Sequence, residues 1–346
     1  MPPVPPLPAA DLDQVLARTE PLWQELRGAR VFLTGGSGFF GAWLVESFLA
    51  IQQRLQLPAQ LWMLCREPQA WSARFPHLAE HPALRLVPGD LAGLRAPGGA
   101  FHGIIHAAAG SDRPFTQFRT MVDGTLRVLD FAQASGARRI LFTSSGAVYG
   151  PPPATREAIA EDDPGSPRPE DPATVYGQAK RASEGLCAAF AAEHGASAVL
   201  ARCFAFVGPH LKLDANYAIG NFIRDALWGE AIRIQGDGTA LRSYLYAGDL
   251  AAWLWTLYFR GPSALPVHVG SDRAISIAEL AATVAAVLRP GLPVSLGAEP
   301  VPGRLPQCYV PALGRARGLG LAPWTGLEEA IWRTGNWYQR KAVFPS

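Results

Sequence analysis

Short apolar runs alternate with longer amphipathic segments between residues 29 and 204. Buried strands are predicted by six runs: 29–34 (ARVFLT), 60–65 (QLWMLC), 83–89 (ALRLVPG), 103–109 (GIIHAAA), 138–145 (RRILFTSS) and 197–204 (SAVLARCF). Helices are predicted where apolar residues recur at helical spacing, in 39–53, 118–136 and 179–195. Such alternation is typical of a parallel sheet covered on both faces. The sequence therefore predicts an α/β fold with a doubly wound, Rossmann-type sheet.

The regular alternation ends near residue 204. Residues 1–28 form an N-terminal extension, which we expect to be flexible over its prolines and helical from residue 11 onward. Residues 29–203 should form the sheet domain. Residues 204–346 mix loops, helices and short strands, so we expect mainly a smaller C-terminal lobe, interleaved with the sheet domain, that closes over a ligand. A long polar loop rich in proline precedes residue 175, and such loops often cover active sites.

Composition limits the classes of partner. Apolar residues make up 49% and charged residues 17% of the 346 residues, which is enough for a sizeable core. The net charge of +2 offers no broad basic surface for nucleic acid or for an anionic membrane. We therefore expect neither as a partner, and any anion that the protein binds must be held locally.

The cysteines and the N-terminus point to an intracellular location. Cys65, Cys187, Cys203 and Cys308 lack the paired spacing of a zinc site or a disulfide framework, so we expect free thiols and no metal. The N-terminus has no basic region followed by an apolar run, and no apolar segment is long enough to span a bilayer. These features favour a cytoplasmic protein.

A glycine-rich loop follows the first predicted strand. The stretch VFLTGGSGFFG places Gly35, Gly38 and Gly41 three residues apart, between that strand and the next helix. Glycine permits a tight turn and a close approach of the backbone to a pyrophosphate, whose charge would meet the helix N-terminus. These glycines, with Phe39 and Phe40, are candidate dinucleotide contacts. A plain strand–helix turn is the alternative.

The second predicted strand ends without the acid that usually holds a ribose in dinucleotide folds. Arg66 follows Cys65 at this point. An arginine there can pair with a ribose phosphate, which favours NADP over NAD as the cofactor. A solvated surface arginine is the alternative.

Residues after the third and fourth strands complete the candidate cofactor site. Asp90 and Leu91, in the sequence GDL, follow the third strand, where a side chain could meet adenine. Ala107 and Ala108, in HAAA, follow the fourth strand and are small enough for a cofactor to lie across the strand ends. We expect His106 to be structural rather than catalytic.

A tyrosine and a lysine stand four residues apart in VYGQAK, so Tyr176 and Lys180 would share one helix face. Ser145 precedes them at the end of the fifth strand. With TGGSGFFG, GDL, HAAA, SSGAVYG, RCFAFVGP, GDGTALRSYLYAGDLA and GRLPQCYVP, these residues resemble the extended short-chain dehydrogenase/reductases of the nucleotide-sugar epimerase and dehydratase family. The resemblance covers nearly all of residues 29–335.

The resemblance implies a mechanism based on hydride transfer with NAD or NADP. Tyr176 would be the general acid or base at a sugar hydroxyl, and Ser145 would hydrogen-bond the reacting oxygen. Lys180 would lower the pKa of Tyr176 and hold the nicotinamide ribose. An ordinary pair on a helix surface is the alternative for Tyr176 and Lys180. The non-enzyme alternative is a dinucleotide-sensing regulatory protein, although such sensors typically lack this pair.

Small residues after Ser145 narrow the reaction. Sugar 4,6-dehydratases of this family carry an Asp–Glu pair directly after the active-site hydroxyl residue, and the nucleotide-sugar decarboxylases keep a glutamate in that region. Gly146 and Ala147 stand there in this chain. The resemblance therefore favours an epimerase acting at sugar carbon 4. An NADPH-dependent 4-ketoreductase of a nucleotide 4-keto sugar is the alternative, and Arg66 points toward it.

The resemblance also implies a nucleotide-diphosphate sugar as the substrate. Arg242 and Arg304 match arginines that grip the diphosphate, and bidentate guanidinium groups suit that role. Asn221 and Phe222 match a segment that contacts the nucleotide sugar. Ala205 stands where the family often has asparagine, so one usual substrate contact is missing.

A homodimer is the assembly that the resemblance implies. It would form through the helix near residues 116–135 and the helix that carries Tyr176. The apolar faces of these helices include Leu126, Leu129, Leu186 and Phe190, which equally suit packing within one chain.

Overall fold

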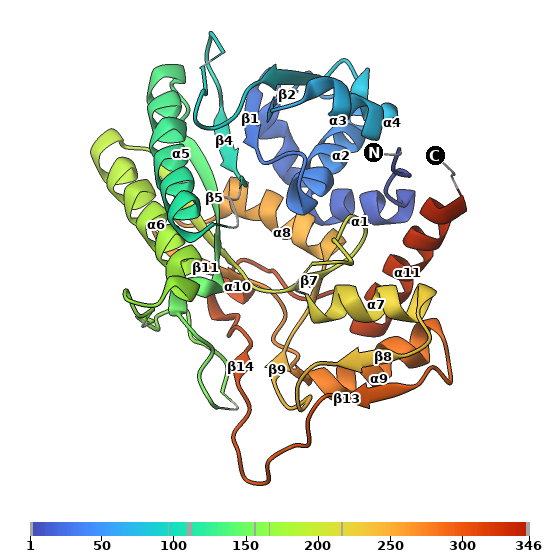
Figure 1. Cartoon of the computed structure of the whole chain (residues 1–346). Coiled ribbons are helices and arrows are strands. Elements are labelled where there is room, and N and C mark those ends of the chain that lie inside the picture. The colour runs from blue at the N-terminus through green and yellow to red at the C-terminus, as the bar shows by residue number, and fades with distance from the viewer. Residues whose placement is uncertain are drawn as a thin grey trace.

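The computed structural model describes residues 3–95, 97–108, 113–155, 157–165, 167–215 and 217–343, with side chains to residue 340. Within these residues a seven-stranded parallel sheet forms the centre of the molecule (Figure 1). Its strands are, in spatial order, β11 (Pro266–Val269), β6 (Ser197–Cys203), β5 (Arg139–Ser145), β4 (Gly103–His106), β1 (Arg30–Thr34), β2 (Gln60–Cys65) and β3 (Leu84–Pro88).

All six predicted strands are present, and the doubly wound α/β fold is confirmed. The order from β3 through β1 to β6 means that the winding changes direction between β1 and β4. At such a switch point the connections leave the carboxyl ends of the two strands in opposite directions, which opens a crevice where ligands bind. The topology therefore places the candidate site at this edge of the sheet.

Helices surround the sheet and build the C-terminal lobe. In chain order they are α1 (Ala9–Thr19), α2 (Phe39–Arg54), α3 (Pro68–Arg74), α4 (Pro76–Ala79), α5 (Pro114–Ser135), α6 (Val175–His194), α7 (Ala218–Trp228), α8 (Ala247–Arg260), α9 (Ile277–Leu288), α10 (Gly314–Gly318) and α11 (Leu327–Val343), with the 3₁₀ turns η1 (Glu20–Leu26), η2 (Gly146–Tyr149) and η3 (Pro172–Thr174). None of the helices in the described part of the chain is both long enough and apolar enough to cross a membrane.

Different apolar cores lie on the two faces of the sheet. α5 and α6 run side by side over one face (Figure 1), where Phe32 of β1 meets Phe131 of α5 with ring centroids 4.6 Å apart. Over the other face, α2 and α8 pack with the N-terminal segment around Trp23 and Trp255, whose ring centroids lie 4.7 Å apart. Burial on both faces explains why the strands read as continuous apolar runs.

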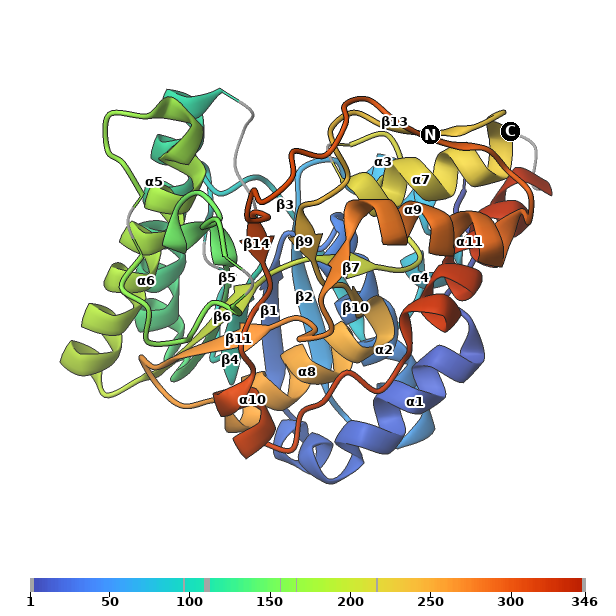
Figure 2. The same cartoon turned by 90° about the horizontal axis from the view of Figure 1, so that it is seen from below.

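The C-terminal half both builds a lobe and returns to the sheet. β11 joins the sheet beside β6, and α8 packs beneath it. The lobe contains α7, α9 and α11 and short strands: β7 (Phe206–Val207), β8 (Ile232–Ile234), β9 (Leu241–Arg242), β10 (Leu245–Tyr246), β12 (Ile275–Ser276), β13 (Val294–Leu296) and β14 (Cys308–Tyr309). Figure 2 shows β9 and β14 next to each other, and their backbones pair in parallel.

The N-terminal extension is packed against the rest of the chain. We expected its proline-rich start to be flexible, but Val4 and Leu7 are buried in the main core. The Leu7 amide donates to Glu46 Oε1 of α2 at 2.6 Å, and Trp337 Nε1 of α11 donates to the Pro6 carbonyl at 3.1 Å. The structure corrects that expectation because these apolar side chains cover surface that α2 and α11 would otherwise expose.

Asp11 of α1 joins the extension to the C-terminal lobe. Its side chain is 1% exposed. Its Oδ2 accepts a hydrogen bond from the Tyr246 hydroxyl at 2.6 Å, and Arg333 of α11 donates to its Oδ1. Burial raises the pKa of this carboxyl, and both partners oppose the rise. One carboxylate therefore connects the first helix of the chain with the last.

We expect Asp11→Ala to lower the free energy of unfolding by about 3 kcal/mol, because the buried Tyr246 hydroxyl loses its acceptor and Arg333 loses one of its two carboxylate partners. Asp13→Ala is the matched control. Asp13 lies on the same helix and pairs with Arg54 at the surface, so its loss should cost less than about 1 kcal/mol. Urea unfolding of the two variants measures both values, and equal losses would contradict a role for Asp11 in joining the termini.

Candidate active site

The glycine loop lies between β1 and α2, at the switch point of the sheet. Gly35 has φ +78°, and a Cβ there would lie 2.4 Å from the Ala107 carbonyl oxygen of the neighbouring strand end. A Cβ at Gly41 would lie 2.3 Å from the Gly35 carbonyl oxygen. Both positions therefore require glycine for the packing of the loop itself.

Gly38 is different, because the protein leaves room for a Cβ there. Its nearest contact would be the Gly35 carbonyl oxygen, at 3.4 Å. Gly38 is also the N-cap of α2, and no side chain in the described part of the chain caps that helix. The exposed amides of a helix N-terminus favour an anion. The glycine thus keeps open the space where a pyrophosphate would approach, and the loop fits a dinucleotide.

Phe39 and Phe40 form the first residues of α2. Both are half-buried and pack against the main core, and Phe40 meets Phe206 with ring centroids 5.1 Å apart. Their side chains anchor the helix N-terminus. Only their backbone amides are therefore suited to contact a phosphate.

The ends of β2 and β3 bring their candidates to the same edge. Arg66 follows β2 and its side chain is exposed. Asp90 is also exposed, and its Oδ1 accepts a hydrogen bond from the Gly93 amide at 2.8 Å, so it stabilises its own turn. Leu91 packs against Gly124 of α5 and lines the pocket at this edge.

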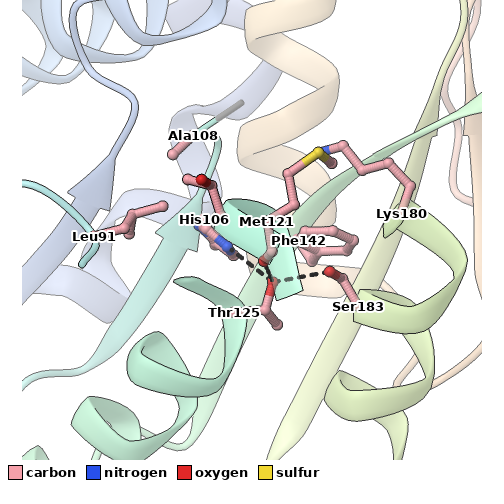
Figure 3. Close-up of a pocket in the computed structure, with 9 residues that line it drawn as sticks. Leu91, His106, Ala108, Met121, Thr125, Phe142, Lys180 and Ser183 are labelled. Carbon is pink, nitrogen blue, oxygen red and sulfur yellow. Dashed lines mark hydrogen bonds between the residues drawn. The ribbon is translucent and has the colours of Figure 1, made fainter. Parts of the chain in front are cut away.

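That pocket lies between the ends of β4 and β5 and the helices α5 and α6 (Figure 3). It is lined by Leu91, His106, Ala108, Thr120, Met121, Thr125, Phe142, Lys180 and Ser183. Ala107 lies beside it, with its amide donating to the Thr34 carbonyl at 3.2 Å. Ala109, the last residue of the HAAA sequence, lies outside the described residues.

A chain of hydroxyls and an imidazole forms one side of the pocket (Figure 3). Thr34 Oγ1 lies 2.7 Å from His106 Nδ1, Thr125 Oγ1 lies 3.3 Å from His106 Nε2, and Thr125 donates to Ser183 Oγ at 3.0 Å. Burial, with a contribution from Lys180, lowers the pKa of His106 to about 3, so this imidazole is neutral. His106 of β4 therefore forms hydrogen bonds with β1 and α5, and Thr125 extends this network to α6.

Tyr176 and Lys180 lie on the first turns of α6, as their spacing predicted. Gly177 lets this helix approach closely, because a Cβ there would lie 2.1 Å from the Ala147 carbonyl oxygen. The Tyr176 hydroxyl thereby reaches the Ser145 side chain at the end of β5. Lys180 is fully buried, and its Nζ donates to the Thr143 carbonyl at 2.7 Å.

Burial controls the acidity of both groups. It raises the pKa of Tyr176 to about 12, and the interaction with Ser145 opposes the rise. Burial also lowers the pKa of Lys180 to about 8. Lys180 Nζ lies 5.9 Å from the centroid of the Tyr176 ring. We expected Lys180 to lower the pKa of Tyr176, whereas in this structure desolvation of the phenol dominates.

The site also contains Gly177 and Tyr309, whose roles were not predicted from the sequence. Tyr309 stands in the GRLPQCYVP sequence, in a strand of the C-terminal lobe, yet its hydroxyl lies next to Gly146 and interacts with Ser145. The signal for Gly177 was present, since glycine in the first turn of a helix is unusual without a close contact. Nothing local in the sequence indicates that Tyr309 reaches the fifth strand.

The two candidate phosphate-gripping arginines occupy different surroundings. Arg242 of β9 is half-buried; its Nη1 donates to the carbonyls of Leu241 at 2.8 Å and Gln307 at 3.2 Å, and its Cζ lies 5.9 Å from the centroid of the Tyr309 ring. Arg304 is exposed on the loop between β13 and β14; hydrogen bonds from Thr239, with a smaller contribution from the charge of Arg304, lower the pKa of Asp237. The structure thus places Arg242 beside Tyr309, whereas Arg304 is on the surface.

Asn221 and Phe222 lie on the first turns of α7. Asn221 is half-buried, and its Oδ1 accepts a hydrogen bond from Arg224 Nη1 at 3.4 Å. The Phe222 side chain is 4% exposed and belongs to the main core. Asn221 can therefore offer its side chain to a ligand, and Phe222 can offer only its backbone.

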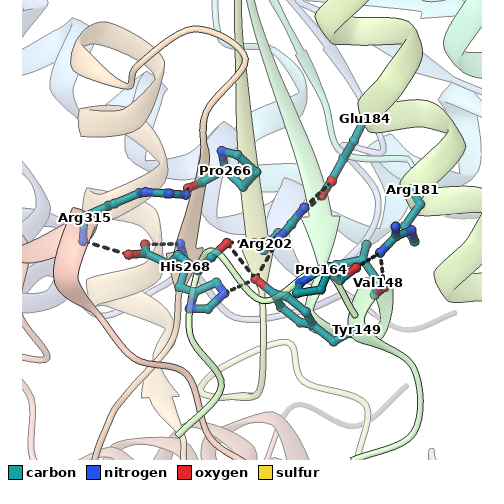
Figure 4. A network of polar contacts seen from close by, with 10 residues as sticks. Val148, Tyr149, Pro164, Arg181, Glu184, Arg202, Pro266, His268 and Arg315 are labelled. Carbon is teal, nitrogen blue, oxygen red and sulfur yellow. Dashed lines mark hydrogen bonds and ion pairs between the residues drawn. The ribbon is translucent and has the colours of Figure 1, made fainter. Parts of the chain in front are cut away.

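A buried ion pair supports the loop that follows Ser145 (Figure 4). Arg202 of β6 pairs with Glu184 of α6 at 2.8 Å, and its Nη1 donates to the Tyr149 hydroxyl at 2.7 Å. The same hydroxyl lies 2.6 Å from His268 Nε2 of β11. Tyr149 ends η2, which begins directly after Ser145. The network therefore fixes the backbone that carries Ser145.

Comparison with known proteins agrees with this geometry. Residues 31–270 match the sequence model of the NAD dependent epimerase/dehydratase family. The chain belongs to this family. Its members use a dinucleotide, in accord with the open space at Gly38 and the helix N-terminus beside it.

Curated and solved relatives in this family cover most of the chain. It is 29% identical over 311 residues to UDP-glucuronic acid decarboxylase 6 of Arabidopsis thaliana, spanning 87% of this chain and 86% of the relative. The structure of MoeE5 in complex with UDP-glucose and NAD is 27% identical, with a TM-score of 0.71 over 90% of this chain and 99% of that one. A UDP-galactose 4-epimerase structure is 26% identical, with a TM-score of 0.67 and the same two coverages.

We expect Gly38→Ala and Gly41→Ala to have different effects. Gly38→Ala should keep the free energy of unfolding within about 1 kcal/mol of the wild type and weaken dinucleotide binding by about tenfold or more, or about 1.4 kcal/mol. Gly41→Ala should destabilise the protein by about 2 kcal/mol or more, because its Cβ meets backbone. Urea unfolding and a fluorescence titration with the dinucleotide measure the two effects. Unchanged affinity in Gly38→Ala would contradict the proposed contact.

The stability of the protein should depend on pH through Lys180. Its pKa is about 8 in the folded state against 10.5 for the free group. Between these values the unfolded chain keeps a proton that the folded protein has lost, so the free energy of unfolding rises with pH. Other groups titrate in this range, and Lys180→Met isolates the lysine. We expect the wild type to gain up to roughly 3 kcal/mol relative to Lys180→Met across the range. A difference independent of pH would show that the pKa of Lys180 is not lowered.

Proposed function

We propose that the protein is an NAD(P)-dependent nucleotide-sugar epimerase that acts by hydride transfer at sugar carbon 4. The observation that carries this proposal is the meeting of Ser145, Tyr176 and Lys180 at the crevice edge of the sheet, with the small residues Gly146 and Ala147 next to them. Tyr176 could transfer a proton, and Ser145 could orient the substrate. No carboxylic acid directly follows Ser145, which argues against dehydration and decarboxylation.

Each side chain has a distinct role in this proposal. Tyr176 exchanges a proton with the oxygen on sugar carbon 4, and Ser145 holds that oxygen by a hydrogen bond. The buried phenol is protonated at neutral pH, since its pKa is about 12, so it is ready to donate to the oxygen of a keto sugar. Lys180 would hold the nicotinamide ribose, and the loop from Gly35 to Gly41 would hold the pyrophosphate. The bound cofactor supplies the hydride-transfer chemistry.

Decarboxylation and dehydration are less well supported, although curated relatives include UDP-glucuronic acid decarboxylases. Both reactions use acids close to the active-site hydroxyl residue in this family, and Gly146 and Ala147 offer none. An added acid at position 146 would have to displace the Tyr309 hydroxyl, because a Cβ there would lie 2.5 Å from it. The similarity of the chain to a UDP-galactose 4-epimerase agrees with an epimerase.

A 4-ketoreductase is the second candidate. The observation that favours it is Arg66, which is exposed at the end of β2, in the place where a ribose phosphate of NADP could pair with it. A reductase would draw on free NADPH, whereas an epimerase would retain NAD through its cycle.

We also propose a nucleotide-diphosphate sugar as substrate, with Arg242, Arg304 and Asn221 as contacts and the backbone of Phe222 beside them. The neighbouring MoeE5 structure contains UDP-glucose. Arg242 is the better placed of the two arginines, because its strand pairs with the strand that carries Tyr309.

The proposed assembly is a homodimer through α5 and α6. Leu129 and Phe190 are buried in the core of their own chain, but Leu126 is 42% and Phe118 is 39% exposed on α5. Leu186 is half-buried on α6. A second copy would cover these apolar side chains, and the molar mass of the protein in solution tests this assembly.

The function is tested by incubating the protein separately with UDP-glucose, with UDP-glucuronic acid, and with a nucleotide 4-keto sugar together with NADPH. Mass spectrometry of the purified protein identifies any dinucleotide that it retains. We expect retained NAD and a product inverted at carbon 4. Tyr176→Phe should reduce turnover by about 10²–10⁴-fold. Tyr258→Phe is the control, since its hydroxyl lies 2.8 Å from His102 before β4, at the opposite edge of the sheet.

Other results would replace the proposed reaction. Release of carbon dioxide from UDP-glucuronic acid would identify a decarboxylase. Consumption of NADPH with the keto sugar by a protein purified without cofactor would identify a reductase. Full turnover in Tyr176→Phe would contradict the mechanism for all of these reactions.

A further inference from the structure

Tyr309 enters the catalytic site from the C-terminal lobe. It lies on β14, directly opposite Arg242 of β9 in the parallel pairing of these strands. Its ring packs on Phe204, with centroids 4.8 Å apart. Its hydroxyl stands 2.5 Å from the position that a Cβ would take at Gly146. A phenol from the lobe therefore occupies the space beside Ser145 that a side chain at position 146 would otherwise fill.

Two tyrosines compete for one serine hydroxyl. Ser145 Oγ accepts a hydrogen bond from the Ala147 amide at 3.1 Å. The hydroxyls of Tyr176 and Tyr309 both interact with the Ser145 side chain. A serine hydroxyl has one hydrogen and two acceptor positions. If Tyr309 donates to the second acceptor position, the serine hydrogen is left for Tyr176 or for a substrate oxygen.

Burial favours this orientation. The Tyr309 ring lies between Phe204 and the backbone at Gly146, and its hydroxyl remains protonated because burial raises its pKa well above neutrality. The Tyr309 side chain is half-buried, and a polar group shielded from water is destabilising unless it has a hydrogen-bond partner. In the described part of the chain, Ser145 is the side chain whose hydroxyl interacts with that of Tyr309, so we take it as the acceptor.

We propose that Tyr309 is a positioning residue that donates to Ser145 and so directs the serine hydrogen toward the reacting oxygen, with Gly146 as the glycine that admits it. This proposal rests on the proposed function, since it concerns the same serine. It adds a residue from the lobe to the machinery of the sheet domain. The serine is correctly oriented only when β14 lies against the end of β5.

The kinetic test is a double-mutant cycle of Tyr309→Phe and Ser145→Ala. The phenylalanine keeps the ring packing and removes only the donor. We expect Tyr309→Phe to lower kcat by about tenfold, the worth of one oriented hydrogen bond, with KM for the nucleotide sugar nearly unchanged. In the Ser145→Ala background the same change should have no further effect. Equal losses in both backgrounds, an effect on KM alone, or no effect would overturn the proposal.

Tyr258→Phe is the control, because it also removes a buried tyrosine hydroxyl but one that lies 2.8 Å from His102, away from the site. It should leave kcat unchanged. A loss as large as that of Tyr309→Phe would show that removal of any buried phenol hydroxyl lowers activity, and would overturn the positioning role.

A second measurement does not depend on turnover. Buried tyrosine hydroxyl protons exchange slowly, and NMR of protein labelled at the tyrosine ζ carbon can assign that of Tyr309. We expect Ser145→Ala to shift this proton upfield, because its acceptor is lost, and to leave the Tyr258 hydroxyl proton unmoved. An unshifted Tyr309 proton would overturn the proposed hydrogen bond. If no nucleotide sugar is converted, the proposed function fails, and this measurement still decides whether Tyr309 positions Ser145.

Discussion

The site depends on backbone contacts that only glycine allows. Gly35 lies against the carbonyl of Ala107, Gly41 lies against the carbonyl of Gly35, and Gly177 lies against the carbonyl of Ala147. Each contact brings one element of the crevice to van der Waals distance from the next. A methyl group at any of these three glycines would push the neighbouring elements apart. The resulting displacement would be too large for a catalytic hydrogen bond across the crevice.

The same close packing shields Tyr176 and Lys180 from water, and this changes the pKa of both side chains. It raises the pKa of Tyr176 and lowers that of Lys180, so both groups are pushed toward their neutral forms. The close fit that positions the pair therefore also opposes the ionisation that the proposed proton transfer requires. A site of this kind is most reactive when ligands bring compensating charge and hydrogen bonds, which couples catalysis to a correctly bound substrate.

The sequence predicted what is local and missed what is distant. The strands, the glycine loop and the Tyr176–Lys180 spacing could be found because period, turn residues and helical spacing are encoded within a few positions. The packing of Val4 and Leu7 on the core, and the reach of Tyr309 to Ser145, depend on contacts between residues far apart in the chain. No periodicity records such contacts. The acidity of Tyr176 could not be predicted from the sequence for a related reason, since desolvation depends on everything packed around the phenol.

The residues that make this chain similar to its family are spread over the whole fold, whereas the residues that would determine its reaction lie around Ser145. The chain is 29% identical to a decarboxylase and 26% identical to an epimerase whose structure it shares, so overall similarity does not distinguish the two reactions. In the proposed function, the reaction depends on a few atoms around Ser145. There, Gly146 has no side chain, and the phenol of Tyr309 fills the space that it leaves. A phenol can orient a hydroxyl, but it is far too weak an acid to drive elimination as a carboxyl group does. A carboxylic acid at position 146 would therefore bring to this serine a stronger acid than Gly146 and Tyr309 provide, without any change of fold.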